Sequence, residues 1–369
     1  MKFILSFVLL FAFFAFNCKS PTAFKGYYQT DTTWVQCQGL PEANVTGFAA
    51  SGNNIVAGTY NVFLSQAYIY ISFDNGYTWK LDATFHVNSK SPISHLYIGT
   101  SVTFFEGNGY LLAGIQGGFS HGNIYISTNN GLSWNDKGIS WPKNDTSGLG
   151  EDVNDFTSLA GNVYAGTDRG VFRTTDNGKN WISVNTGLPI PPFPAGLQVM
   201  RIVGARTALF AGTTSKGIFI SNNNGDSWEN VNSGLSSLAI YGLTVMGTNV
   251  YSGAFTFSSD SIGGVFLYIS NESSWKAINN GLSDHKINIL AGGSGYLFAG
   301  TNSGLFISAN QGRSWSYDSI GTPSQSLAVI SLAVINSHLY VGTMHGAWRF
   351  PISQLPTVMK SEEKQRQKK

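Results

Sequence analysis

The chain has 369 residues and a formal net charge of +2 at pH 7, with 43 glycines, 14% aromatic residues and 11% charged residues. This composition favours many short strands joined by tight turns, because glycine adopts positive φ and aromatic rings pack on pleated faces. Much of the basic excess lies in residues 360–369, so no basic stripe remains and nucleic-acid binding is excluded.

The first segment is typical of an export signal. Residues 4–16 are apolar apart from one serine and follow Lys2, and they are too few to span a bilayer. We expect residues 1–18 to be a signal peptide and 19–30 a linker. Cys18 stands where a bacterial lipoprotein carries its lipidated cysteine, although "AFNC" departs from the usual Leu-Ala-Gly-Cys pattern. A cell-envelope lipoprotein and a secreted protein both stay open, and we expect membrane contact only through such a lipid anchor.

An octapeptide recurs along the chain. It reads "SFDNGYTW" at 72–79, and near-copies stand at 127–134, 174–181, 221–228 and 308–315, with a shortened copy, "SNESSW", at 270–275. An apolar segment ending near an Ala-Gly-Thr-like triplet precedes each copy, and the triplet glycines recur every 41 to 56 residues at Gly58, Gly114, Gly166, Gly212, Gly253, Gly300 and Gly342. A period of this length with about four short strands indicates the blade of a β-propeller.

The seventh copy, "LYVGTMHGAWRFPIS" at 339–353, has no octapeptide after it. The missing strand is found near the start of the chain, where "TTWVQCQGLP" (32–41) matches "KNWISVNTGLP" (179–189) in its Trp and its Gly-Leu-Pro. We therefore predict an all-β fold, a seven-bladed β-propeller of four-stranded antiparallel blades over 31–355, whose last blade is closed by the N-terminal strand. Residues 356–369 are predicted to be a disordered charged tail. Cys37 has no obvious disulfide partner and is predicted to be a small buried hydrophobic residue.

The octapeptide is predicted to build a hairpin turn between the third and fourth strands. An Asp or Asn side chain accepts hydrogen bonds from turn N–H groups, the Gly adopts a dihedral that other residues resist, and the Trp packs on the blade. Because the acidic position holds Asn129, Asn223 and Asn310 as well as Asp74 and Asp176, a metal-binding or proton-donating role is disfavoured. The octapeptide is therefore interpreted as structural.

The pattern S-x-D-x-G-x-x-W resembles the Asp-box, or BNR repeat, of the sialidase-like propeller superfamily. The resemblance covers about residues 31–355 and implies boxes on the rim, away from any active site. The superfamily includes sialidases, xyloglucanases, sortilin-type receptors and photosystem II assembly factors, and the last are nearest in size to this chain. A fold of this kind supports many functions, so the resemblance leaves the activity open.

Ligand sites are expected on the face formed by the turns between second and third strands and by the connections between blades, because long loops on a rigid scaffold carry binding. The predicted binding residues are Trp141, Glu151, Asp152, Asp155, Asp168, Arg169, Asp284, His285 and His345. Other polar residues of these loops are Lys143, Arg201, Lys216, Asp260 and Lys286.

Known catalytic patterns are missing from the sequence. The resemblance implies that a sialidase would need an arginine before the first box, whereas no arginine precedes Arg169, so sialidase activity is disfavoured. The six histidines lack metal-ligand spacing, and no phosphate loop or nucleophile elbow occurs. No cofactor or metal is expected.

Two functions stay open. The favoured one is an exported, non-catalytic module that binds a protein or a glycan at the cell envelope. The alternative is a glycoside hydrolase or lyase that uses Glu151, Asp152, Asp155, Asp168 and Asp284. An enzyme of that kind needs two carboxylates that converge on the channel mouth, roughly 5–10 Å apart.

Overall fold

The computed structural model describes residues 34–41, 43–61, 66–86, 102–107, 109–115, 123–136, 152–190, 197–256, 262–318 and 328–355. The predicted signal peptide, linker and charged tail lie outside these residues, as do Cys18, Trp141 and Glu151. Within the described residues no helix is long and apolar enough to cross a membrane.

The described strands form seven antiparallel sheets, each a blade. Blade 1 holds β2 (Asn44–Ser51), β3 (Asn54–Asn61), β4 (Gln66–Ser72) and β5 (Lys80–His86), and blade 2 holds β6 (Val102–Gly107), β7 (Tyr110–Ile115) and β8 (Asn123–Ser127). Blade 3 holds β9 (Val153–Leu159), β10 (Asn162–Thr167), β11 (Gly170–Thr174) and β12 (Ile182–Ser183), and blade 4 holds β13 (Val199–Ala205), β14 (Ala208–Thr213), β15 (Ile218–Ser221) and β16 (Glu229–Asn230). Blade 5 holds β17 (Ala239–Met246), β18 (Asn249–Phe255), β19 (Gly264–Ile269) and β20 (Ser274–Ala277), and blade 6 holds β21 (Ile287–Gly293), β22 (Tyr296–Thr301), β23 (Gly304–Ser308) and β24 (Ser316–Asp318). Blade 7 holds β25 (Val329–Ile335), β26 (His338–Thr343), β27 (Gly346–Pro351) and β1 (Val35–Gln36), and a 3-10 helix, Ile352–Gln354, follows β27.

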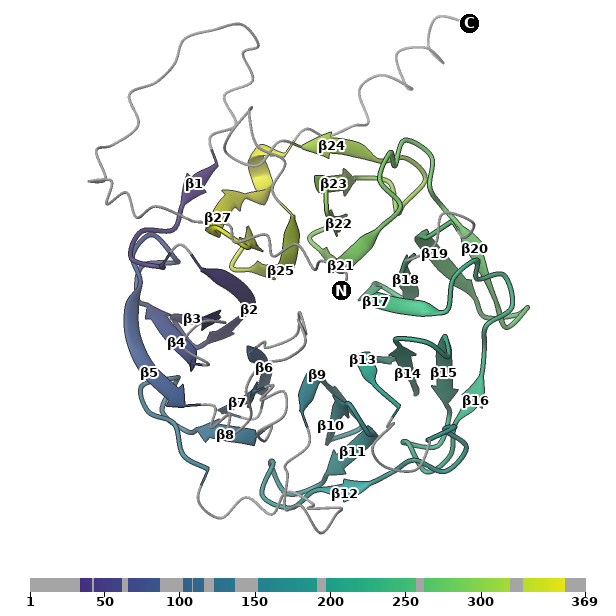
Figure 1. Ribbon diagram of the computed structural model, residues 1–369, viewed down its shortest axis with the longest axis horizontal. Coiled ribbons are helices and arrows are strands. Elements are labelled where there is room, and N and C mark those ends of the chain that lie inside the picture. The colour runs from purple at the N-terminus through teal and green to yellow at the C-terminus, as the bar shows by residue number, and fades with distance from the viewer. Residues whose placement is uncertain are drawn as a thin grey trace, which may run out of the picture. The chain divides into compact units, whose positions relative to one another are not determined.

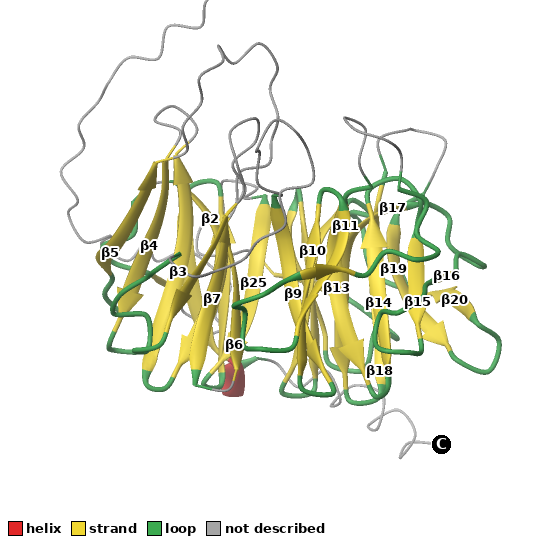
Figure 2. Ribbon diagram, turned by 90° about the horizontal axis from the view of Figure 1, so that it is seen from below, coloured by secondary structure: helices red, strands yellow, loops and turns green. Residues whose placement is uncertain are grey.

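The blades are arranged in a ring around a central axis (Figure 1). Each first strand packs against the first strand of the next blade, in the order β2, β6, β9, β13, β17, β21, β25 and back to β2. Seen from the side, the strands stand between two faces (Figure 2). We call the face with the blade-to-blade connections and the turns between second and third strands the loop face, and the opposite one the box face. The predicted seven-bladed propeller is confirmed.

The N-terminal strand closes the ring, as predicted. Val35 and Gln36 of β1 pair with Arg349 and Trp348 of β27, so β1 is the outer strand of blade 7. The Trp34 ring lies 5.0 Å from the Phe350 ring, and its indole N–H donates to Asp318 of blade 6 at 3.1 Å. The closing segment therefore joins the last blade both to itself and to the blade before it.

The octapeptides form the turns between third and fourth strands. In blade 3 the Asn180 N–H donates to Asp176 Oδ1 at 2.8 Å, and Gly178 has a φ of +84°. In blade 4 the Ser227 N–H donates to Asn223 Oδ1 at 2.9 Å in the same way. Asp and Asn therefore do the same structural work, which supports the structural interpretation of the box.

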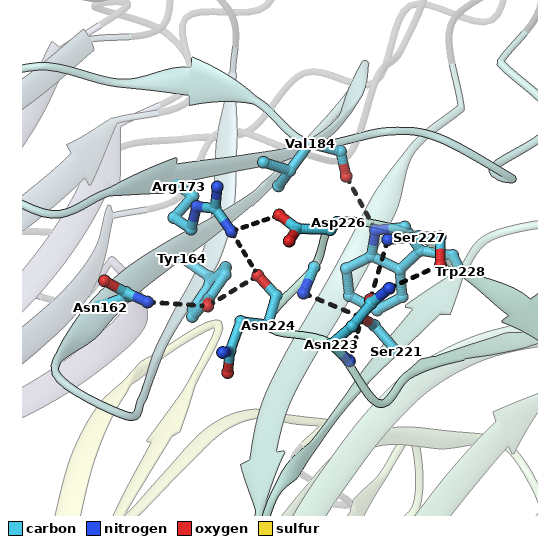
Figure 3. A network of polar contacts seen from close by, with 11 residues as sticks. Asn162, Tyr164, Arg173, Val184, Ser221, Asn223, Asn224, Asp226, Ser227 and Trp228 are labelled. Carbon is cyan, nitrogen blue, oxygen red and sulfur yellow. Dashed lines mark hydrogen bonds and ion pairs between the residues drawn. The ribbon is translucent and has the colours of Figure 1, made fainter.

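The boxes also connect neighbouring blades, which the sequence did not predict (Figure 3). The carbonyl of Asn224 in the blade 4 box accepts hydrogen bonds from Tyr164 Oη at 2.9 Å and from Arg173 Nη1 at 2.8 Å, both of blade 3. Arg173 also pairs with Asp226 at 2.7 Å, and the Trp228 indole donates to the Val184 carbonyl at 2.8 Å. Each of these contacts crosses from one blade to the next.

The triplet glycines let consecutive blades approach closely. A Cβ on Gly166 would lie 2.9 Å from Val199 Cγ1, and one on Gly212 would lie 2.6 Å from Ile240 Cγ2. Val199 and Ile240 are each 0% exposed, and each belongs to the first strand of the following blade. A β-branched side chain therefore fills the space that each glycine leaves open.

Candidate functional site

The seven first strands, which surround the central axis, hold very few charges. As described, they contain three charged residues, Glu106, Asp155 and Arg201. Asp155 pairs with Gly166 and Arg201 pairs with Gly212, so both occupy the position opposite a triplet glycine, near the loop face. Their strands, β9 and β13, are neighbours in the ring. The structure thus places one carboxylate and one guanidinium at the same level of adjacent inner strands.

Asp155 joins these two strands. Its Oδ2 accepts the Ile202 N–H at 2.9 Å and its Oδ1 accepts the Phe156 N–H at 3.0 Å. Burial raises the pKa of the Asp155 carboxyl to about 6, although the Arg201 charge and the two N–H donors act to lower it. This carboxyl therefore changes its charge close to neutral pH.

Arg201 has less hydrogen bonding than its five donor N–H groups allow. Its Nη1 donates to the Met200 carbonyl at 2.8 Å, and among the described residues its buried Nε has no partner. Burial lowers the pKa of Arg201, while Asp155 and Tyr241 act in the opposite direction. A partly buried guanidinium with unused donor capacity is suited to bind an anionic or carbonyl oxygen.

Tyr241 stands on the next inner strand, at a register shift in β17 between Ile240 and Gly242. Its ring lies 5.4 Å from that of Phe255, and burial raises its pKa while Arg201 lowers it. We call Asp155, Arg201 and Tyr241 the charged neck.

Apolar side chains of blade 5 lie near the loop face, and one of them, Phe255, contacts Tyr241 of the charged neck. Leu238, which enters β17, is 43% exposed, and Ile262, which precedes β19, is 60% exposed. The Leu238 carbonyl accepts the Gly217 N–H at 3.0 Å, and Ser236 Oγ donates to the Ile262 carbonyl, so both segments are held at the loop face. We call Leu238, Phe255 and Ile262 the apolar ledge.

Three predicted residues come together on blade 3 above Asp155. The Asp152 N–H donates to Asp168 Oδ1 at 3.1 Å, and the Asp168 N–H donates to the Asp152 carbonyl at 3.2 Å. The Arg169 N–H donates to Thr167 Oγ1 at 3.0 Å in the same turn. These bonds attach the turn between β10 and β11 to the connection that enters β9.

The remaining predicted residues lie on blades 6 and 7. Asp284 accepts the N–H groups of Lys286 and Ser303, each at 3.0 Å. Burial acts to raise the pKa of Asp284, but these hydrogen bonds outweigh it and the pKa is lowered. His285 follows it before β21, and His345 lies in the turn between β26 and β27, where its N–H donates to Thr343 Oγ1 at 3.1 Å. The structure does not bring these three to the charged neck.

Sequence reasoning assigned Arg201 to a loop and did not select Tyr241. Arg201 lies in β13, in the apolar run "VMRIVGA", at the position that Asp155 holds in "VNDFTSL". Aligning the first strands of the blades and looking for charges would have identified the pair. In the described part of the chain, no group of three or more His, Cys, Asp or Glu side chains is placed to hold a metal ion.

The sheets and boxes define the class of protein, a seven-bladed β-propeller with Asp-box repeats. The BNR/Asp-box repeat family matches residues 70–81, which include the whole of the first box. Among curated proteins, no sequence matches the chain significantly.

Solved structures with similar folds include YCF48 proteins and extracellular domains of bacterial proteins. YCF48 from Cyanidioschyzon merolae is 12% identical with a TM-score of 0.61, and the match covers 87% of this chain and 99% of that one. YCF48 bound to D1 peptide is 15% identical with a TM-score of 0.59, covering 87% and 98%. The extracellular domain of the one-component system BT4673 from B. thetaiotaomicron is 17% identical with a TM-score of 0.57. The match covers 88% of this chain but only 40% of that chain. At these identities the likeness shows a shared fold.

Proposed function

We propose that the protein is an exported, non-catalytic binding module that holds a protein partner on its loop face at blades 3 to 5. The observation that carries the proposal is the juxtaposition of the charged neck with the exposed apolar ledge. Exposed apolar surface beside a few oriented polar groups is the usual composition of a binding site. Arg201 supplies directional donors, and Leu238 and Ile262 supply apolar area.

The similar structures support a protein partner and an extracellular location. One of them is YCF48 bound to a peptide, and others are extracellular domains of bacterial signalling proteins. The apolar leader at residues 4–16 agrees with export, and Cys18 is the residue that a lipid anchor would use. A glycan is the second class of ligand, and the test below distinguishes it from a protein.

The test is site-specific photocrosslinking in living cells of the native host. A benzophenone amino acid replaces Ile262 on the apolar ledge in one version and Leu132, which is 53% exposed in the blade 2 box, in a matched control. We expect discrete protein adducts from position 262 that weaken when Arg201 is changed to Gln, and none of them from position 132. The same adducts from both positions, or adducts insensitive to Arg201→Gln, would contradict the proposal. Adducts that contain carbohydrate without protein would assign a glycan instead.

The raised pKa of Asp155 keeps the enzymatic alternative open, because a carboxyl with a pKa of about 6 can serve as a general acid. The group beside Asp155 on the next inner strand is a guanidinium, whereas a glycosidase needs a second carboxylate. Hydrolysis of a fluorogenic glycoside that disappears in Asp155→Asn would establish the enzyme and overturn the non-catalytic proposal.

A further inference from the structure

We propose that the charged neck binds an anionic group of the carboxylate class and that Asp155 takes up one proton when that group binds. The inference rests on the proposed function, since it concerns the same part of the loop face, and it adds the chemistry of the ligand and its regulation by pH.

The inner strands of the ring carry very few charges. With Asp155 ionised, the neck holds one negative and one positive charge and is neutral. No other charged residue occurs on the inner strands as described except Glu106, which is exposed near the box-face end of β6. An incoming carboxylate would leave two negative charges facing one guanidinium in a poorly solvated place. Protonation of Asp155 restores neutrality and leaves Arg201 to the ligand.

The surroundings of Asp155 make it the group that responds. Strands β6, β7, β10 and β13 pack against β9, and the ionisable residues they carry are Glu106, Tyr110, Tyr164 and Arg201. Burial raises the pKa of Tyr110 to about 12, and Tyr164 Oη donates to the Asn224 carbonyl. Asp152 and Asp168 stand at the loop-face entrance, attached to each other's backbone, with Arg169 beside them. Arg201, the cationic member of the charged neck, keeps its positive charge throughout the neutral pH range.

The geometry also provides a place for the ligand oxygen. Both carboxylate oxygens of Asp155 accept hydrogen bonds from backbone N–H groups, which fix the position of the carboxyl group. The Arg201 side chain uses Nη1 for the Met200 carbonyl, and residue 201 is partly exposed. Its remaining donor capacity can therefore serve a ligand without breaking the contacts of Asp155.

Proton uptake gives the affinity a characteristic pH dependence. Below the pKa of Asp155 the carboxyl is already protonated and binding is independent of pH. Above that value the affinity falls about tenfold for each pH unit, because each binding event must first protonate Asp155.

Acetate is a suitable probe, because it stays ionised above pH 6, and acetamide is its uncharged control of similar shape. Titrations of the full chain are followed by the NMR signals of Arg201 Nε–H and Tyr241 at pH 6, 7 and 8. We expect acetate to bind about fiftyfold more weakly at pH 8 than at pH 6, because about half of Asp155 is already protonated at pH 6 and only about one hundredth at pH 8, and acetamide to bind weakly at each pH. Asp155→Asn should bind acetate at pH 8 as tightly as the unchanged chain does at pH 6. Glu229→Gln, which removes a carboxylate from the outer strand β16, should behave as the unchanged chain does.

A measurement on the unchanged chain tests the inference even if the Asp155→Asn variant does not fold. At pH 7.5 the carboxyl ¹³C signal of Asp155 should move toward its protonated position as acetate saturates the site. No acetate binding at any pH, equal affinity at pH 6 and 8, or an Asp155 signal that stays ionised would each overturn the inference. These results leave the crosslinks from position 262 unaffected, whereas loss of those crosslinks removes the proposed function whatever acetate does.

Discussion

Asp176 and Asn223 occupy the same place in neighbouring boxes and show how little the box depends on charge. Each accepts one turn N–H, from Asn180 at 2.8 Å and from Ser227 at 2.9 Å. A neutral amide oxygen suffices for this bond, which is why the position tolerates both residues. For Asp176, burial acts to raise the pKa, but the hydrogen bonds from Asn180 and Thr174 outweigh it and the pKa is lowered.

The first prediction follows from that equivalence. Asp176→Asn should leave the free energy of unfolding at pH 7 nearly unchanged, whereas Asp176→Ala should lower it by about 1 kcal/mol through the lost turn bonds. Because the folded pKa of Asp176 is lowered, its ionised form adds stability above the unfolded value of 3.8 and loses it as the pH falls through the folded value. Asp176→Asn should therefore also reduce the loss of stability in acid. Urea unfolding at pH 7 and pH 3 measures both effects, and equal losses for the two variants would refute the interpretation.

At the scale of the elements, the junction between blades depends on a glycine facing a β-branched residue. Gly166 of β10 meets Val199 of β13, and the same arrangement recurs at Gly212 and Ile240. The repeat is visible in the sequence as the Ala-Gly-Thr triplet, but its cause lies in the following blade. Only the packed structure shows that the glycine is needed for close approach and not for a special φ.

The second prediction concerns this junction. Gly166→Ala should destabilise the protein by about 1–3 kcal/mol, because the new methyl group would push the Val199 side chain and its strand away. Adding Val199→Ala should recover part of that loss, as expected for two residues in contact. Gly161→Ala is the control, since nothing lies within 4 Å of its added Cβ and only its φ of +81° opposes the change. Thermal unfolding of these three variants and of Val199→Ala alone tests this, and simple additivity of the two substitutions would exclude a steric conflict between residues 166 and 199.

At the scale of the whole molecule, the ring depends on a strand that comes from the far end of the chain. Trp34 contacts Phe350 and donates to Asp318, and Cys37 follows β1 with its N–H bonded to the Ala347 carbonyl at 3.0 Å. The Cys37 thiol is 4% exposed, and burial raises its pKa to about 12, although a hydrogen bond with Trp79 lowers it. The thiol can therefore react only when the closing segment leaves its place.

The third prediction uses Cys37 as a reporter of closure. In a chain with Cys18→Ser, iodoacetamide at pH 8 should label Cys37 slowly in the folded protein. Trp34→Ala should speed labelling about tenfold or more, since a loss of about 1.4 kcal/mol in closure raises the open population tenfold. Trp228→Ala, in blade 4 and away from the closing strand, is the control and should change the rate far less. Similar rates for the two variants would mean that labelling reports global unfolding and not the opening of blade 7.

The features of this protein that the sequence predicts are those encoded in short segments that repeat along the chain. The turn hydrogen bonds and the Asp-Asn interchange lie within single repeats, and the period and the Trp34 match are seen by comparing one repeat with another, so the seven blades and their closure follow from the residues alone. The sequence also selected Asp155, Asp152 and Asp168 of blade 3, which the structure brings together.

The site depended on tertiary structure, because its members come from different repeats. Asp155, Arg201 and Tyr241 lie on β9, β13 and β17, and they meet only because the inner strands of three blades are neighbours. Asp284 is predicted from the sequence to bind a ligand. In the structure its carboxylate oxygens accept hydrogen bonds from the N–H groups of Lys286 and Ser303. By itself the sequence determined the ring, since its turns and hydrogen bonds close over short distances along the chain. Only the packing of separate blades decided which charged groups are desolvated and lie near one another. Desolvation and charge pairing depend on neighbours that are distant in sequence.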